Sequence, residues 1–209
     1  MPTNEQFISQ LQQKEQQQEH LILLSEKLAT ARNRKDLWNV ITAPLLAFFH
    51  AKFYTLCLIN EDGKSHAPFL YSDEKNILQR TEESPIIHGG LPIDDGIFQE
   101  ALKTKKPTIF HLRKVMKNTK VPPYVYHWYN NGIEEMMLVR IDIGQETRGM
   151  LYLYASKLNS FHKEQFEFLK SIANFIGICV SNILANEKIE IQLNAIQQLK
   201  KQLEKENIF

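Results

Sequence analysis

Apolar residues follow a helical spacing near both ends of the chain and an alternating spacing between them. Residues 21–28 and 37–48 place apolar side chains three or four positions apart, as in helices that bury one face. Residues 161–209 keep the helical pattern for longer than a compact domain requires, and Asn159 or Ser160 can cap its start. We therefore predict helices at both ends of the chain, with part of the last helix projecting beyond the core.

Strand-forming segments occupy the middle of the chain. β-Branched and aromatic residues between turn signals predict strands within 52–60, 65–72, 107–110 and 136–156. The last segment contains two strands joined by a polar turn between Gly144 and Gly149. A short helix over 97–106 follows Asp94 and Asp95, either of which can cap it. This order predicts an α+β fold with a mainly antiparallel sheet of roughly five to six strands, one face of which is covered by the terminal helices.

Four sequence segments in this order span about residues 20–187. They are FYTLCLIN with its EDGK turn, GGLPIDDGIFQEALKTKKPTIF, MMLVRIDIGQETRGMLYLYAS and FHKEQFEFLKSIANFIGICVSNILANEK. Together they resemble the GAF domain, a family of sensory and regulatory modules. The resemblance implies a pocket on the sheet face opposite the terminal helices, roofed by loops. Family members bind cyclic nucleotides, bilins, haem, iron or small organic molecules there, or nothing, so the fold identifies no cofactor.

The last residues carry a second resemblance. The segment AIQQLKKQLEKENIF resembles the helical linker that follows GAF domains in enhancer-dependent bacterial transcription activators of the formate hydrogenlyase activator type, where an AAA+ ATPase domain comes next. The resemblance implies an input domain that controls an attached effector, an AAA+ ATPase or a kinase. We predict an N-terminal helix over 1–31, a GAF-like sensory domain over 32–186 and a C-terminal signalling helix over 187–209.

Composition narrows the possible partners. A chain of 209 residues with 43% apolar residues, 23% charged residues and a net charge of +1 is typical of a globular protein, and gives no global reason to bind nucleic acid or an anionic membrane. The apolar stretch 169–184 is interrupted by polar residues, which favours a buried helix over a membrane span. The first twenty residues lack an export signal, so we expect a cytoplasmic protein.

Arg140 is the most distinctive candidate for ligand binding. Strand alternation places it on the predicted pocket side with Tyr152 or Tyr154 nearby, where it suits a ligand carboxylate or phosphate. A structural salt bridge to Asp142, or to the aspartates before the short helix, is the favoured alternative. The aromatic residues around Tyr126 are candidates for a pocket lid. The predicted ligand-binding residues are Arg140, Tyr152, Tyr154, Asp94, Asp95, Tyr124, Tyr126 and Trp128.

Other chemistries find less support in the sequence. Positions matching the cyclic-nucleotide motif of the family lack its Asn and both acidic residues, so Lys157 has no acidic partner there. Cys57 and Cys179 fall on separate core elements and fit bilin attachment or methionine sulfoxide reduction poorly. The basic run 103–120 could attract an anionic ligand or nucleic acid, but a solvated helix face is the favoured interpretation. No nucleophile with a positioned base is recognisable, so no catalytic residue is predicted.

A metal site is also less favoured than ordinary surface residues. Three histidines fall in the loop region, and acidic residues near them are possible co-ligands for iron or zinc. None of these histidines shows a ligand spacing, so no metal site is predicted. The residues concerned are His88, His111, His127, Asp94, Asp95, Glu134 and Glu135.

The C-terminal segment carries a short heptad pattern. Ile189, Ile196 and Leu203 recur every seven residues, and Leu199 occupies the intermediate position. Pairing of this stripe in a homodimer, with help from the first helix, is favoured over a solitary solvated helix. The predicted dimer and signalling residues are Leu21, Leu24, Leu28, Ile189, Ile196, Leu199 and Leu203. The sequence thus predicts a small-molecule sensor that signals through its terminal helices, with a ligand-free dimerisation module as the alternative.

Overall fold

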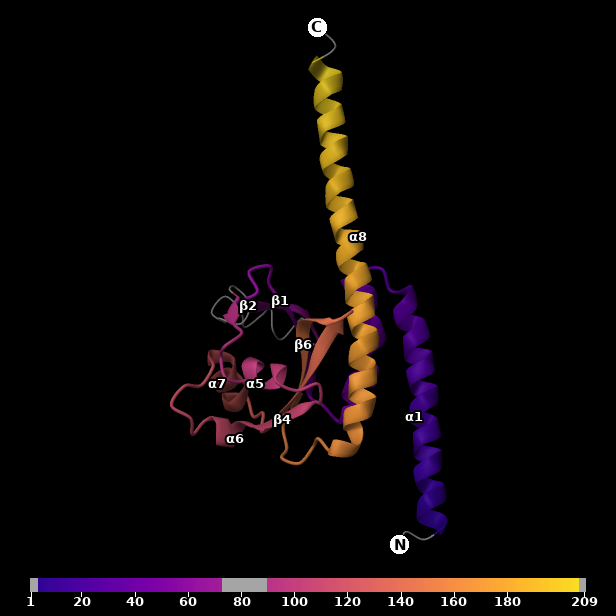
Figure 1. Ribbon diagram of the computed structural model, residues 1–209, viewed down its shortest axis with the longest axis vertical. Coiled ribbons are helices and arrows are strands. Elements are labelled where there is room, and N and C mark those ends of the chain that lie inside the picture. Colours follow the sequence, from indigo (N-terminus) through magenta and orange to yellow (C-terminus); the bar gives the residue numbers. More distant parts are fainter. Residues whose placement is uncertain (1–3, 73–89, 207–209) are drawn as a thin grey trace.

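The structure is a computed structural model that describes residues 4–72 and 90–206 (Figure 1). Its helices are α1 (Asn4–Thr30), α2 (Arg34–Phe49), α5 (Phe98–Leu102), α6 (Leu112–Val115), α7 (Pro123–Asn130) and α8 (Phe166–Glu206), with a 3₁₀ turn η1 (Lys163–Gln165). Its strands are β1 (Phe53–Ile59), β2 (Ser65–Tyr71), β3 (Leu91–Pro92), β4 (Thr108–His111), β5 (Glu135–Ile143) and β6 (Glu146–Ala155).

The strands form one antiparallel sheet in the order β3-β2-β1-β6-β5-β4. The β5–β6 hairpin turns at Gly144, whose φ of 64° suits a residue without a side chain. Gly149 of β6 pairs with Leu58 of the neighbouring strand β1, and a Cβ there would collide with the carbonyl oxygen of Cys57. The predicted α+β fold with a six-stranded antiparallel sheet is therefore confirmed.

Helices from both ends of the chain cover one face of the sheet. α8 contacts β5, and α2 contacts β1 and β2. Figure 1 shows α1 beside the first half of α8, with α5, α6 and α7 on the opposite side of the sheet. Met137, Val139 and Ile141 of β5 pack in the helix-covered core, as strand alternation predicts. Gly177 allows close approach, because a Cβ there would lie 2.4 Å from the carbonyl oxygen of Asp142. The first half of α8 thus lies directly on β5.

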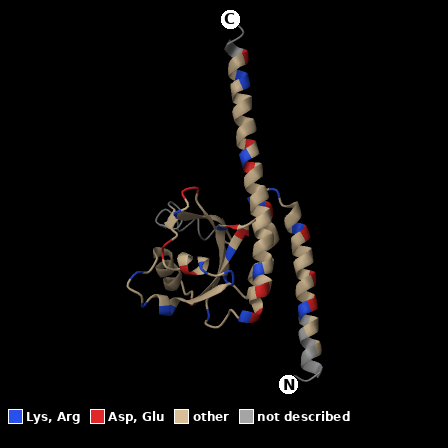
Figure 2. Ribbon diagram, viewed as in Figure 1, with Lys and Arg blue, Asp and Glu red and all other residues tan. Residues whose placement is uncertain are grey.

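The second half of α8 leaves the domain. The helix is continuous over 41 residues, and Figure 1 shows it projecting far beyond the sheet. Figure 2 shows an uncharged stretch within this projection, which corresponds to residues 191–199. One window of α8 is long and apolar enough to cross a bilayer by composition alone, but half of it is buried inside the domain, as in a core helix of a soluble protein. The predicted projection is confirmed, and the division at residues 31/32 and 186/187 stays a prediction.

The final helix begins later than predicted, and neither Asn159 nor Ser160 caps it. Lys163–Gln165 form η1 before α8 starts. His162 and Gln165 form a reciprocal capping box, in which the backbone N–H of His162 donates to Oε1 of Gln165 at 2.9 Å. The caps predicted from the sequence are therefore wrong.

The physical reason is a buried carboxylate from a distant strand. Glu135, at the start of β5, is 1% exposed. Its Oε2 accepts the backbone N–H groups of Ser160 at 2.9 Å and Phe161 at 3.0 Å, and its Oε1 accepts that of Asn159 at 3.3 Å. Nδ1 of His111 lies 3.0 Å from the same Oε1. Glu135 therefore fixes this segment in a non-helical conformation.

Candidate functional site

Strand alternation brings one set of side chains to the sheet face opposite α8, which we call the site face. β6 contributes Met150, Tyr152 and Tyr154, and β1 contributes Thr55 and Cys57. The short helices α5, α6 and α7 cover these side chains. Phe98, Tyr124 and Trp128 pack among them and are 7% exposed or less. The site face is therefore a buried, aromatic layer distinct from the helix-covered core.

Asp95 is the buried carboxylate of the site face. Its Oδ1 accepts the backbone N–H groups of Ile97 at 2.8 Å and Phe98 at 2.7 Å, at the start of α5. Its Oδ2 accepts the hydroxyl of Tyr124 on α7 at 2.7 Å. Of the two predicted caps, Asp95 binds these N–H groups although the N-cap position of α5 is Ile97, and Asp94 is exposed. Asp95 thus joins α5 to α7 across the top of the sheet.

His66 of β2 lies beside this carboxylate. Its Nε2 is 3.9 Å from Oδ2 of Asp95, and the histidine is 1% exposed. The ring stacks on Phe98 with 4.2 Å between centroids. Burial raises the pKa of the Tyr124 and Tyr152 hydroxyls well above their usual range, and the nearby Asp95 adds to the effect. These hydroxyls stay protonated near neutral pH, where they can donate or accept hydrogen bonds.

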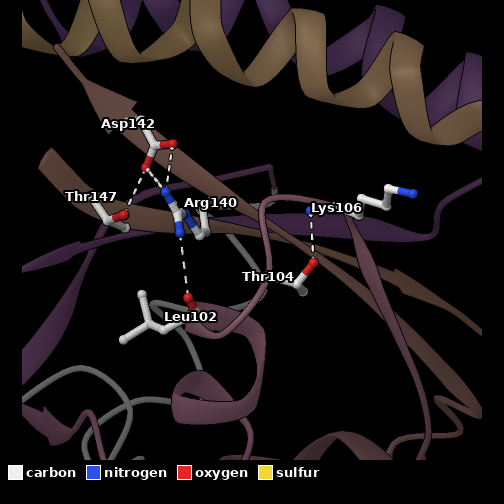
Figure 3. A network of polar contacts seen from close by, with 6 residues as sticks. All are labelled: Leu102, Thr104, Lys106, Arg140, Asp142 and Thr147. Carbon is white, nitrogen blue, oxygen red and sulfur yellow. Dashed lines mark hydrogen bonds and ion pairs between the residues drawn. The ribbon is translucent and has the colours of Figure 1, made fainter. Parts of the chain in front are cut away.

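Arg140 is held in a local salt bridge, as Figure 3 shows. Its Nη2 lies 2.9 Å from Oδ2 and 3.1 Å from Oδ1 of Asp142, and its Nη1 donates to the carbonyl of Leu102 at 3.4 Å. Thr147 also donates to Asp142, at 2.7 Å. Partial burial raises the pKa of the Asp142 carboxyl, but the hydrogen bonds from Arg140 and Thr147 outweigh this and lower it overall. Arg140 therefore joins β5 to the end of α5.

The predicted lid residues separate into two groups. Trp128 packs against Phe53, with 4.5 Å between ring centroids, and against Tyr154, with 5.0 Å. Tyr124 belongs to the same buried layer. Tyr126 lies on the outer side of α7 and is 46% exposed. The structure therefore gathers Asp95, Tyr124, Trp128, Tyr152 and Tyr154 and leaves Asp94, Tyr126 and the paired Arg140 outside this cluster.

Sequence reasoning missed His66 and the hydroxyl group of Thr55, both of which are buried. Alternation from Cys57 places Thr55 on the same face, so the sequence contains a signal for it. The position of His66 depends on the pairing of β1 with β2, and an extra residue of β2, Phe69, shifts that register opposite Leu56 and Cys57. No local pattern reveals such a shift. The histidine could be assigned only once the strands were paired.

The two thiols lie on opposite faces of the sheet. Cys57 is 5% exposed in the site-face layer, and Cys179 is 2% exposed in the helix-covered core. Burial raises the pKa of both thiols, that of Cys179 to about 11. Both groups are therefore protonated near neutral pH, which makes them poor nucleophiles.

No three His, Cys, Asp or Glu side chains gather closely enough to hold a metal ion within residues 4–72 and 90–206. His111 lies beside Glu135, and His127 packs edge-on against Trp128 with 4.7 Å between centroids. His88 lies outside the described residues.

A groove of about 420 Å³ opens on the other side of the domain, among α1, α2 and α8. Leu24, Val40, Phe48 and Phe168 form much of its apolar wall, with Lys27 at the α1 side. Such a surface offers few groups that could orient a polar ligand. The polar groups of the site face make it the better candidate site.

Comparisons with known proteins agree with this geometry. No family model matches the chain. The chain is similar to the GAF domain of a phosphoenolpyruvate-protein phosphotransferase from Coxiella burnetii, with a TM-score of 0.63 and 13% identity over 82% of this chain and 96% of that one. It is similar to the GAF domain of a sensor histidine kinase from Bacillus halodurans, with a TM-score of 0.58 and 12% identity over 74% of this chain and 98% of that one. It is also similar to a phycocyanobilin-bound GAF domain from a cyanobacterial phytochrome, with a TM-score of 0.58 and 16% identity over 80% of this chain and 94% of that one. The chain therefore has the GAF fold.

A curated relative comes from transcription regulation. The chain is 26% identical over 113 residues to the DNA-binding transcriptional activator HyfR of Escherichia coli K12. The match covers 54% of this chain and 17% of HyfR. This agrees with the resemblance to regulators of the formate hydrogenlyase activator type.

Proposed function

We propose that the chain is a sensory and regulatory domain in which a small molecule at the site face changes the arrangement of α8. The observation that carries this proposal is the continuity of α8, whose first half lies on the sheet and whose second half projects from it. A single rigid element therefore connects the domain core to anything that contacts the projection. The GAF-type neighbours, which include the domain of a sensor kinase, support the same role.

Strand β5 provides the physical link between the two faces. Met136 and Leu138 pack in the site-face layer, whereas Met137 and Val139 pack in the helix-covered core beneath α8. A ligand that binds two arrangements of this strand with different affinity would shift their populations. Because the backbone at Gly177 is packed against that of Asp142, a movement of β5 is transmitted to α8.

We also propose that the projecting half of α8 forms a homodimer. Ile189, Ile196, Leu199 and Leu203 are 53–61% exposed and lie on one heptad stripe. An exposed apolar stripe of this kind is typical of a helix with a partner. Leu24 and Leu28 of α1 are already buried in the core of the same chain, at 6% and 3% exposure. The projection of α8 therefore carries the contact, because these α1 residues hold α1 onto the domain.

The effector follows by analogy with the relative in transcription regulation. We propose that α8 leads to an effector domain, an AAA+ ATPase or a kinase, in a cytoplasmic regulator. The domain itself would contact neither nucleic acid nor membrane. HyfR is a DNA-binding transcriptional activator, which supports an output in transcription.

Sedimentation of the chain over a range of concentrations tests the dimer. We expect the wild-type chain to dimerise. The double variant Ile196→Glu with Leu199→Glu should be monomeric, because it places like charges on the heptad stripe where the two helices would meet. Ile191→Glu is the matched control, since Ile191 is 70% exposed and lies off the stripe. A wild type that remains monomeric throughout, or a control that dissociates equally, would contradict the proposal.

A second candidate function is a ligand-free dimerisation module. It is favoured by the site face itself, where Phe98, Trp128 and Tyr152 fill much of the interior and are at most 7% exposed. The two candidates differ in one measurement. A sensor is stabilised by its ligand, whereas a bare module shows no stabilisation by any compound in a thermal-shift screen.

A further inference from the structure

Unpaired polar atoms gather on the site face. Within the described residues, nine buried side-chain nitrogen and oxygen atoms have no hydrogen-bond partner of normal geometry, and five belong to four residues of the site face. These atoms are the hydroxyl oxygens of Thr55, Tyr71 and Tyr152 and both ring nitrogens of His66. Each unsatisfied buried group costs on the order of 1–3 kcal/mol of folding free energy. A cluster of such groups therefore requires an explanation, and a ligand that supplies the missing partners is one.

The sheet register places the three hydroxyl-bearing residues in one row. Thr55 of β1 pairs with Tyr71 of β2 on one side and with Tyr152 of β6 on the other. Thr55 and Tyr152 are at most 2% exposed. His66 lies further along β2 beside Asp95. We call these three hydroxyl groups together with the imidazole the hydroxyl row.

The charges around the hydroxyl row indicate which ligands it suits. Asp95 is the nearby carboxylate, so an anionic ligand would be repelled. Arg140 already faces Asp142 in a bidentate pair and is not available to balance an anion. The hydroxyl groups are protonated because burial raises the pKa of Tyr152 and Tyr71. The ring of Phe98 stacks on the imidazole of His66, and the ring of Tyr152 lies nearly parallel to it with 6.4 Å between centroids.

We propose that the hydroxyl row binds an uncharged planar molecule that carries both hydrogen-bond donors and acceptors, such as an aromatic amide. The amide group supplies partners of both kinds for hydroxyls and imidazole, and its ring packs against the aromatic walls. This inference rests on the proposed sensory function and names the class of ligand. It differs from the expectation that Arg140 captures a carboxylate or phosphate.

Removal of single hydroxyl groups tests the proposal in the absence of any ligand. Tyr152→Phe and Thr55→Val keep the shape of the side chain and delete only the unpaired oxygen. We expect each to raise the thermal midpoint of the chain by about 2–4 °C, because an uncompensated polar group is removed. Tyr126→Phe on the exposed side of α7 is the control and should leave the midpoint unchanged. A lowered midpoint in the two buried variants would overturn the proposal, since it would show that the hydroxyls are paired within the protein.

Matched pairs of compounds then test the ligand class. Nicotinamide and benzamide at millimolar concentration should raise the midpoint of wild type, whereas nicotinate and benzoate should not. Tyr152→Phe should lose most of the shift given by the amides, and Tyr126→Phe should keep it. Stabilisation by the acids alone, by none of the four compounds, or equally in both variants would overturn the assigned ligand class. A broader thermal-shift screen tests the sensory proposal separately: stabilisation by a compound of another class would keep that proposal and overturn only the ligand class assigned here.

Discussion

The helix-covered face and the site face are built from alternate residues of the same strands, yet they differ in whether they bury polar side-chain groups. Met137, Val139 and Ile141 of β5 pack in the apolar core beneath α8. On the other face, Thr55 and Tyr152 bury hydroxyls that have no hydrogen-bond partner of normal geometry. A packed apolar interior maximises stability, whereas unsatisfied polar groups reduce it and are expected where a protein binds something. The comparison supports the proposed division, in which the helix-covered face would supply stability and transmission and the site face would supply recognition.

The largest expected effect is a loss of packing on the helix-covered face. Ile176 of α8 is fully buried against the sheet, so Ile176→Ala should lower the free energy of unfolding by about 2–5 kcal/mol through lost contacts and a residual cavity. Urea unfolding measures the change. Ile178→Ala, two residues along the same helix and 60% exposed, should change stability by less than about 0.5 kcal/mol. Equal losses at both positions would show that α8 does not pack as described.

A somewhat smaller effect is expected where Glu135 joins β5 to the segment that precedes α8. Glu135→Ala leaves the backbone N–H groups of residues 159–161 without their acceptor, and should lower stability by about 2–3 kcal/mol. Hydrogen exchange at these three amides should become faster in the same variant. Glu134→Ala, at a neighbouring and partly exposed position, is the control. Unchanged exchange at residues 159–161 in Glu135→Ala would remove the assigned role.

Local patterns in the sequence predicted the elements that depend on local spacing. The β5–β6 hairpin, the alternation of β5 and the length of α8 all follow from periodicity, and the structure confirms them. The salt-bridge alternative for Arg140 was also accessible, because Asp142 stands two residues away on the same strand face. These features require no knowledge of which strands are neighbours.

Features that depend on distant pairing were not predictable. Glu135 controls the start of α8 from a position more than twenty residues earlier, so a cap assigned from residues 159–160 alone was wrong. The hydroxyl row appears only when β2, β1 and β6 are aligned, with the bulge at Phe69 of β2 included. Tyr124 and Tyr126 look equivalent in the sequence for a similar reason, because the face that α7 presents to the sheet depends on distant contacts. In the structure Tyr124 is buried and Tyr126 is exposed.

The smallest expected effect concerns the pair of Arg140 and Asp142 at the edge of the site face. Because the folded pKa of Asp142 is lowered, its contribution to stability is complete above the ordinary value of 3.8 and is lost as the pH falls through the folded pKa. The side chain of Asp142 is 28% exposed, so solvent screening limits this contribution to less than about 1 kcal/mol.

Asp142→Asn tests this contribution through the pH dependence of stability. The variant should lose less stability than wild type when the pH is lowered from 6 to about 2, because it has no carboxylate to protonate at this position. Urea unfolding at several pH values measures the difference. Glu146→Gln provides the control, since Glu146 pairs with Arg148 and both side chains are more than half exposed. If wild type and Asp142→Asn gave parallel curves, Arg140 would not depend on this carboxylate, and it would again be available to an anionic ligand at the site face.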